Sequence, residues 1–352
     1  MRDPIDLIIE LSPDARFDVL DLRSRFSTED HEALAPYPRC LYWSAHTTAG
    51  FLDRSLTARL GPTQISTYVE TLRRIFPEHA GYEHDRLERR TDLDPAQRAV
   101  EPPNGDSHLA FIAGGLRPCV MHPNDGAEPV YFLELDGVHA GQRRRRVTRV
   151  IGFNREVTVA EMRIDVPVSG HPIDSINLKD PRLGIYPRLS EFVARAGAGT
   201  GRLHLALDRD ERHAALTVNE FETLLMKFDL PAVLRSPLRF MAAQYRGAMS
   251  NPRAVPSKAL GYAQYDLVRV FNSSLDTLRL QNSIVEKVLA RTLAVPASRF
   301  FRIRRSVSLL VAEREDGCPG FVEGPYQSPI LVQWARPARR TRVLDVTLTR
   351  VE

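Results

Sequence analysis

Apolar residues alternate with polar ones, or recur every three to four positions, in separate stretches of the first half of the chain. Ile5 to Glu10 alternates weakly and is rich in Ile and Leu, and Cys40 to Ala45 is similarly apolar, so each stretch predicts a β-strand. From Gln64 to Phe76 the apolar side chains recur at spacings of three and four. This period predicts a helix that Pro77 ends.

The remainder of the first half predicts a loop and two closing strands. Residues 85 to 105 are charged and Pro-rich without periodicity, which is typical of a surface loop, whereas His108 to Leu116 fits either a helix or a strand. Val130 to Leu135 and Arg145 to Phe153 are predicted strands on either side of an Asp136-Gly137 turn. We therefore expect the first half to end in a hairpin.

The second half repeats this order of elements. Strands are predicted at Val157 to Val166 and Gly201 to Leu207, and an amphipathic helix at Thr217 to Leu230. Two further helices and three strands complete the prediction, at Pro237 to Met249, Asp276 to Leu293, Val307 to Ala312, Ile330 to Trp334 and Arg342 to Leu348. Both halves end with a strand, an Arg-bearing turn and a Val-rich strand, which indicates a tandem duplication. The predicted domains are residues 1–156 and 157–352, with a helical insertion near 240–300 in the second.

Composition agrees with two soluble domains. A chain of 352 residues, 43% of them apolar, exceeds what one core usually holds. No apolar stretch approaches the roughly 18 residues that cross a bilayer, and no secretory signal is recognisable, so we expect a cytoplasmic protein. The three cysteines are far apart, which argues against disulfides and CxxC metal clusters. Any metal must then be held by His, Asp or Glu.

The cations are nearly all arginine. Only four of the 48 Lys and Arg residues are Lys, and none precedes Lys179. This excludes a Walker A lysine or a Schiff-base lysine from the first half, and no GxxxxGK[ST] or GxGxxG motif occurs. The aromatic residues do not interleave with the basic ones as on a stacking platform, so we expect neither nucleic acid nor membrane as a partner.

Three histidines of the first half lie beside acidic or hydroxyl residues, in segments predicted as strand ends or loops. His46, His84 and His108 would suit a zinc-class divalent ion with one position left open, and Asp85 or Asp106 would orient the imidazoles. The alternative is three separate hydrogen-bonding histidines. Their spacing leaves both interpretations open.

The motifs around these histidines resemble the YjbQ-like family, also called secondary thiamine-phosphate synthase. They are His46-Thr-Thr-Ala-Gly, Gly81-Tyr-Glu-His-Asp, and Asn104 followed by His108-Leu, and they fall in family order within residues 5–153. The resemblance implies an α+β fold, mainly an antiparallel sheet or sandwich with packed helices, that assembles as a trimer. It also implies clustered histidines at a metal site. In some members it implies condensation of the pyrimidine and thiazole halves of thiamine phosphate.

The second half resembles the same family at other positions. Asn219-Glu220 matches an Asn-Glu that the family carries on a helix, and Gly324-Pro-Tyr-Gln327 matches a motif before the penultimate strand, whereas the first half lacks both. The second half has Glu211 in place of the first histidine, and the position of the third falls in Arg299 to Arg302. These complementary losses suggest one composite site per chain. The alternative is that both halves have decayed into a scaffold.

We therefore expect two fused YjbQ-like domains that form a metal-dependent enzyme, acting on a small phosphorylated or anionic substrate, with condensation and loss of pyrophosphate as the implied reaction. The alternative is a non-catalytic ligand-binding or assembly protein. A divalent metal, zinc-class or Mg, and a homotrimer are expected. The candidate residues are His46, His84 and His108 as metal ligands, Glu220, Asn219 and Asp85 as catalytic groups, and Thr47, Thr48, Asn104, Arg143, Arg145 and Gln327 as substrate contacts.

Two of these assignments have a plain structural alternative. Glu220 shielded at a domain interface could act as a general acid or base, or it could be a solvated surface glutamate. Alternate guanidiniums of Arg143 to Arg146 could hold a phosphate or carboxylate in bidentate fashion, or they could block edge-to-edge strand pairing.

Overall fold

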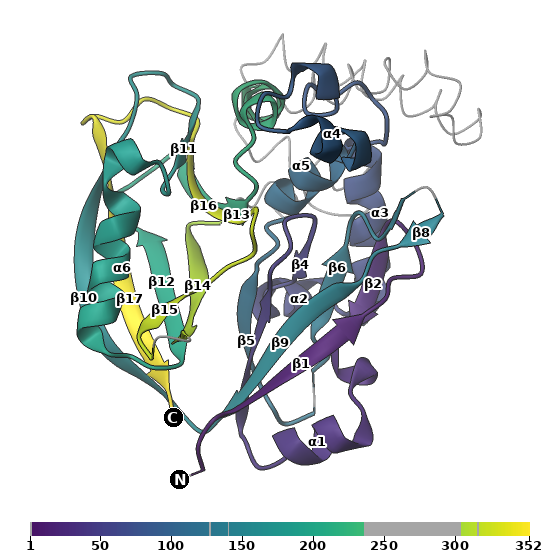
Figure 1. The fold of residues 1–352 in the computed structure, drawn as a ribbon, viewed down its shortest axis with the longest axis vertical. Coiled ribbons are helices and arrows are strands. Elements are labelled where there is room, and N and C mark those ends of the chain that lie inside the picture. The colour runs from purple at the N-terminus through teal and green to yellow at the C-terminus, as the bar shows by residue number, and fades with distance from the viewer. Residues whose placement is uncertain (1, 127, 140, 236–303, 315–316) are drawn as a thin grey trace.

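The computed structural model describes residues 2–126, 128–139, 141–235, 304–314 and 317–352 (Figure 1). Within these residues the protein is a mixed α+β structure whose named strands all pair antiparallel. The helical insertion near 240–300, its two predicted helices, and the Arg299 to Arg302 region lie outside the described residues.

The first half contains two facing sheets. One has the order β1 (Ile5–Leu11), β9 (Arg146–Phe153), β3 (Arg39–Ser44) and β5 (Cys119–Pro123); the other has β2 (Asp18–Asp21), β6 (Tyr131–Glu134) and β4 (Ala49–Phe51). Their apolar faces meet in one core cluster that includes Tyr42, Phe51 and Phe132. This core follows from the alternation of apolar and polar positions along the strands.

The second half has the same relative strand order. Its larger sheet runs β10 (Glu156–Pro167), β17 (Thr341–Val351), β12 (Gly201–Leu207), β14 (Ser306–Glu313), β15 (Pro319–Val322), and its smaller sheet runs β11 (Asp174–Asn177), β16 (Ser328–Gln333), β13 (Ala214–Asn219). In each half the first strand pairs with the last and the last pairs with the third. The third strand then pairs with β5 in the first half and with β14 in the second. The two sheets of the second half enclose a second core cluster, and helix α6 (Ile185–Ala196) packs against it through Leu189 and Val193.

The helices of the first half and the helical turn of the second half share one core. Helices α2 (Arg54–Leu60), α3 (Ile65–Ile75) and α5 (Gly105–Ala113) contribute to it, and so do the π-helical turn η5 (Leu225–Asp229) and α7 (Leu230–Arg235). Members from the second half include Leu225, Met226, Leu230, Val233, Ile330 and Val332. The larger sheets of the two halves also touch, where Leu41 and Trp43 of β3 meet Leu310 of β14 and Val351 of β17. This continuous packing explains how residues distant in sequence come to share a site.

The remaining elements are short. They are α1 (Thr28–Leu34), α4 (Pro95–Val100), β7 (Val138–His139), β8 (Gln142–Arg143), and the 3-10 turns η1 (Arg23–Arg25), η2 (Pro62–Gln64), η3 (Leu87–Arg89) and η4 (Pro181–Leu183). No helix in the described ranges has the length and apolar character to cross a bilayer.

The strongest periodic patterns were predicted correctly. The strands at Ile5 to Glu10 and Cys40 to Ala45 and the helix before Pro77 correspond to β1, β3 and α3. The ambiguous stretch after His108 is helical, as part of α5. A short connection, Asn154-Arg155, lies between the halves, between β9 and β10.

Three predictions differ from the structure. The closing hairpin is wrong, because β6 and β9 belong to different sheets. The segment 85–105 is not all loop, since Asp94 caps the short helix α4. The helix predicted from Thr217 begins only at Thr223, because residues 214–219 form strand β13, which pairs with β16.

Candidate metal centre

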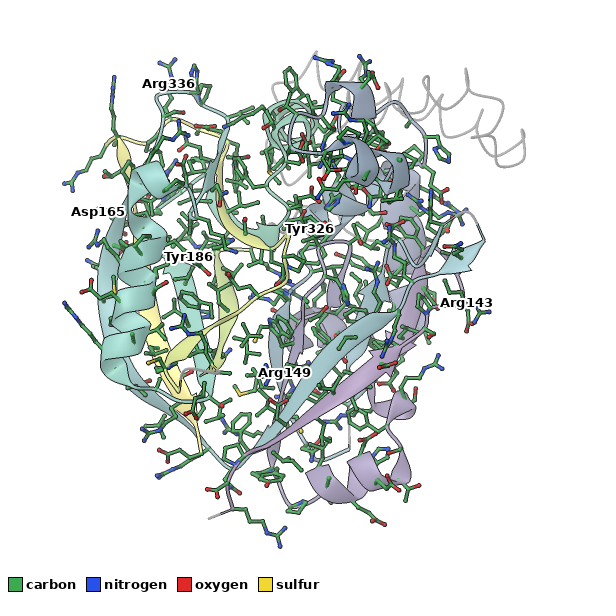
Figure 2. The ribbon with its side chains drawn as sticks, viewed as in Figure 1. Arg143, Arg149, Asp165, Tyr186, Tyr326 and Arg336 are labelled. Carbon is green, nitrogen blue, oxygen red and sulfur yellow. The ribbon has the colours of Figure 1, made fainter. Side chains whose placement is uncertain are left out.

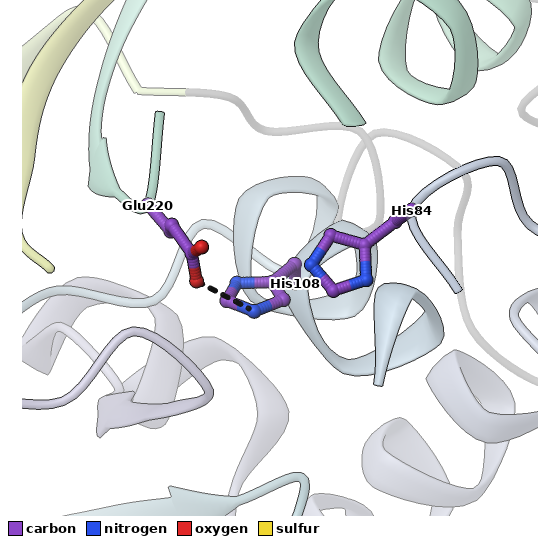
Figure 3. A group of neighbouring side chains, drawn as sticks. All are labelled: His84, His108 and Glu220. Carbon is purple, nitrogen blue, oxygen red and sulfur yellow. Dashed lines mark ion pairs between the residues drawn. The ribbon is translucent and has the colours of Figure 1, made fainter. Parts of the chain in front are cut away.

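Three side chains from distant parts of the chain converge at the junction of the two halves. His84, His108 and Glu220 each present one ligand atom, and these atoms lie within 4.8 Å of one another (Figure 3). His84 follows α3 in a loop, His108 lies on α5, and Glu220 follows directly after β13. Both histidines are buried and Glu220 is partly buried. The site therefore combines two imidazoles of the first half with a carboxylate of the second.

His108 has a defined tautomer. Its Nδ1 lies 2.8 Å from Oδ1 of Asn219, and that oxygen also accepts from the backbone N–H of Glu220 at 2.9 Å. The amide of Asn219 cannot be turned over, because its Nδ2 donates to the carbonyl of Thr47 at 2.8 Å. His108 therefore donates from Nδ1 and carries a lone pair on Nε2. Burial lowers the pKa of His108 to about 4, so the ring is neutral at pH 7.

His84 is held from two sides. Its Nδ1 lies 3.2 Å from Oδ1 of Asp85, which also accepts from the backbone N–H of Gly105 at 2.9 Å. The backbone N–H of His84 donates to Asp229 of the π-helical turn at 2.9 Å. Nε2 lies 3.0 Å from Nη1 of Arg90. Burial disfavours charge on this ring, but Asp85 and Glu220 outweigh it and raise the pKa of His84. A guanidinium can only donate, so the contact with Arg90 still requires a lone pair on Nε2 of His84.

Arg90 is the cation of this site. Its side chain is fully buried and its Nη2 donates to Oε1 of Glu220 at 3.0 Å. The guanidinium also makes two bonds with Asp92, at 2.9 Å and 2.6 Å, and Nε lies 3.6 Å from Oε1 of Glu222. Both Asp92 and Glu220 hold the charged form of Arg90 and raise its pKa further, against the opposing effect of burial.

The donor set fits a zinc-class cation. Two neutral imidazole nitrogens and one carboxylate are ligands that zinc prefers, whereas Mg²⁺ favours oxygen ligands alone. Nε2 of His108 is buried without a hydrogen-bond partner and lies 3.4 Å from Oε2 of Glu220, a contact marked in Figure 3. A lone pair facing a carboxylate is unfavourable unless a cation lies near both.

His46, the first predicted metal ligand, lies elsewhere. Its Nε2 accepts from the backbone N–H of Val147 at 3.1 Å, and burial, Arg146 and Arg144 together lower its pKa to about 3. Among the described residues, the group that could hold a metal contains Glu220 and not His46. The reason is local: β3 ends at Ser44, opposite Thr148 of β9, and the ring of His46 bonds the neighbouring Val147 of that strand.

The two predicted orienting aspartates take different roles. Asp85 contacts His84, as described above. Asp106 instead pairs with Arg16 at 2.7 Å, and burial raises its pKa to about 7. Asn104 donates to Asp136 at 3.0 Å, while its own Oδ1 is buried without a partner.

Other predicted substrate contacts hold backbone segments or one another. Oγ1 of Thr48 accepts from Arg146 at 3.1 Å, and the carbonyl of Thr47 accepts from Asn219. Gln327 donates from Nε2 to the carbonyl of Ser44 at 2.8 Å and to that of His46 at 3.2 Å. Gln327 thus ties the second half to the segment that carries the His-Thr-Thr motif. Substrate binding by these residues stays a prediction.

The arginine run separates into an exposed pair and an inward pair. Arg143 pairs with Asp14 and Arg145 with Glu10, and these guanidiniums are mostly exposed (Figure 2 labels Arg143). Arg144 and Arg146 point inwards instead and reach the fully buried Asp136 and Glu134. The structure therefore does not bring Arg143 and Arg145 to the histidines.

Four residues of the site were not predicted. Arg90 and Asp92 lie in the non-periodic segment 85–105, and Glu222 and Asp229 lie in a stretch predicted as one helix. The oxygens of Glu222 accept from the backbone N–H groups of Leu224 and Leu225, which starts the helical turn that carries Asp229. Only the nearness of Glu222 to Glu220 in sequence could have drawn attention to it.

No protein-family model matches the chain, and no curated protein matches it. Several solved structures do. A protein of Sulfolobus solfataricus described as YbjQ-like and of unknown function is 15% identical, with a TM-score of 0.31, over 56% of this chain and 99% of its own. A hypothetical protein of Aeropyrum pernix is 15% identical, with a TM-score of 0.30, over 54% and 97%. An uncharacterised protein of the YjbQ family from Clostridium acetobutylicum is 13% identical, with a TM-score of 0.25, over 54% and 99%. The structural neighbours of this chain thus include YjbQ-like proteins, which match about half of it.

Proposed function

We propose that the chain is a metal-dependent enzyme of YjbQ-like type, with one composite site built by both halves. One observation carries the proposal: Nε2 of His108 is buried, has no hydrogen-bond partner, and faces the carboxylate of Glu220. We propose His84, His108 and Glu220 as the ligand set for a zinc-class ion. Glu220 thereby replaces His46, and it serves as a ligand rather than as a free acid or base.

A tandem duplication supports the composite site. In the larger sheet of each half the last strand lies between the first strand and the third. Each half also has a second sheet of three strands. Under duplication, β13 of the second half is the counterpart of β4 in the first. The residue after β13 supplies the carboxylate, and the corresponding residues after β4 do not join the group of ligands.

The chemistry proposed for the site is transfer or hydrolysis at an anionic substrate. A zinc-class ion held there would polarise a substrate oxygen and stabilise negative charge on a leaving group. Asn219 holds His108 in the ligating tautomer, and Asp85 does the same for His84. Arg90 supplies positive charge for an anionic group. Condensation with loss of pyrophosphate, as in secondary thiamine-phosphate synthases, is the first reaction to assay.

A scaffold function is the second candidate, and one observation favours it. Arg90 already neutralises Glu220 and contacts His84, so the junction holds a cation of its own. Under this alternative the cluster binds the two halves together and no metal is needed.

Metal analysis tests the proposal. The purified full chain is incubated with excess zinc, dialysed, and analysed for bound metal. We expect about one equivalent in the wild type and in His46→Ala, and loss of most of it in His108→Ala and Glu220→Ala. Exposed His31 offers the matched control His31→Ala. Absence of zinc from the folded wild type, or full retention in both ligand variants, contradicts the proposed site.

A further inference from the structure

Arg90 and a divalent cation require the same atoms. Nη1 of Arg90 lies 3.0 Å from Nε2 of His84, and Nη2 lies 3.0 Å from Oε1 of Glu220. Both atoms belong to residues of the proposed ligand set. No other guanidinium among the described residues is recorded within hydrogen-bond distance of these two ligand atoms.

The single lone pair on Nε2 of His84 makes Arg90 and a cation mutually exclusive. A neutral imidazole has one acceptor nitrogen, and the contact with Asp85 commits Nδ1 to donation. Nε2 can therefore accept from Arg90 or bind a cation, but not both. Glu220 has a second oxygen, so it alone would not force a choice.

We infer that Arg90 is a built-in competitor for the metal site, whose guanidinium must leave His84 before a divalent cation can bind. The inference rests on the proposed metal-dependent function. Arg90 excludes weakly binding cations from the junction and keeps the ligand atoms paired when no metal is present. Only a cation that binds two imidazoles and a carboxylate strongly displaces it.

The surroundings of Arg90 permit this displacement. Asp92 holds the guanidinium through two hydrogen bonds, and Glu222 lies within ion-pair distance of Nε. Neither carboxylate belongs to the ligand set. Arg90 therefore keeps two acidic partners after it releases His84 and Glu220. The released N–H groups would then be available to an anionic substrate group bound beside the cation.

Zinc affinity of the full chain measures the competition. Zinc is titrated against a chromophoric chelator with wild type, Arg90→Met and the control Arg89→Met. Arg89 pairs with Glu83, and its side chain is 44% exposed. We expect Arg90→Met to bind zinc about tenfold or more tightly than wild type, because charge-assisted hydrogen bonds no longer oppose binding. Arg89→Met should bind as the wild type does. Equal affinity of wild type and Arg90→Met overturns the inference and leaves the metal site standing. Failure of both folded proteins to bind zinc overturns the metal site and the competition together.

A second measurement does not depend on the folding of Arg90→Met, which leaves several carboxylates without their partner. In the wild type labelled with ¹⁵N-arginine, the guanidinium protons of fully buried Arg90 should exchange slowly and give resolved signals, which Arg90→Lys identifies by their absence. We expect these signals to shift on addition of one equivalent of zinc, while those of buried Arg146 stay in place. Unchanged Arg90 signals at full zinc occupancy overturn the inference.

Discussion

Asn219 accepts a hydrogen bond from His108 over 2.8 Å, although 111 residues separate the two in the chain. Thr47 and the backbone of Glu220 fix the amide that receives it, so Asn219 sets which nitrogen of His108 can bind a cation. An Asn219→Leu variant removes this acceptor while keeping similar volume. We expect zinc affinity to fall by about 10–100-fold, the usual effect of losing a partner that orients a ligating histidine.

The matched control is Asn154→Leu, because Asn154 is partly exposed and its side-chain amide donates to the carbonyl of Arg2. Circular dichroism and thermal unfolding show whether each variant is folded. If folded Asn219→Leu binds zinc as tightly as Asn154→Leu, Asn219 does not position His108 for a metal.

The inward arginines should matter more for stability than the exposed ones. Nη2 of Arg146 lies 2.7 Å from Oε1 of Glu134, and the carboxylate is fully buried, whereas the side chain of Arg143 is 60% exposed beside Asp14. Arg146→Met leaves a buried charge without its partner and should lower the free energy of unfolding by about 3–5 kcal/mol. Arg143→Met should lower it by less than about 1 kcal/mol.

Urea denaturation at pH 7 measures both changes. The double variant Arg146→Met with Glu134→Gln should recover part of the loss, since the uncompensated charge is gone. Equal effects of Arg146→Met and Arg143→Met would contradict the division of the arginine run.

His122 predicts a pH dependence of stability. The ring is buried against Tyr42, with a centroid distance of 5.8 Å, and neither ring nitrogen has a hydrogen-bond partner. Burial, and then the charge of Arg23, lower the pKa of His122 from 6.5 to about 4. Arg54 lowers it as well, and the carboxylates of Glu128 and Asp53 act in the opposite direction. Below pH 6.5 the unfolded chain therefore binds a proton that the folded chain does not. The neutral ring of His122 therefore contributes roughly 3 kcal/mol to the free energy of unfolding. This contribution is complete above pH 6.5 and is lost as the pH falls towards 4.

His122→Phe should remove this slope, because phenylalanine fills the same apolar space without a titratable group. The measurement is the difference in free energy of unfolding between pH 7 and pH 5, with His31→Phe at an exposed position as control. If His122→Phe loses as much free energy of unfolding between pH 7 and pH 5 as the wild type does, His122 does not titrate as its burial requires.

Local periodicity of apolar residues predicted many of the strands and helices but few residues of the site. Strands β1 and β3 and helix α3 could be predicted because their apolar periods are local properties of the chain. The pairing of β6 and β9 with different partners could not, because strand pairing depends on residues far away in sequence. The helical pattern from Thr217 was partly real, but tertiary pairing with β16 holds residues 214–219 as a strand.

The site shows the same division. His84, His108 and Glu220 were reached through resemblance of short motifs, since their spacing alone carries no metal signature. Arg90 had no such signal. It lies in a charged, non-periodic segment, and its role arises only from contacts with His84 and with Glu220 of the other half.

The junction also depends on a close backbone approach at Gly324. A Cβ at this position would lie 1.9 Å from the carbonyl oxygen of Ala45, and Gln327, three residues on, binds the carbonyl of Ser44. Gly324→Ala must therefore push the loop of the second half away from the His-Thr-Thr segment. We expect a loss of about 1–3 kcal/mol in the free energy of unfolding, together with weaker zinc binding. Gly170→Ala is the control, because a Cβ there meets nothing within 4 Å. If the two variants are equally stable and bind zinc equally, the close contact between the halves at Ala45 does not support the site.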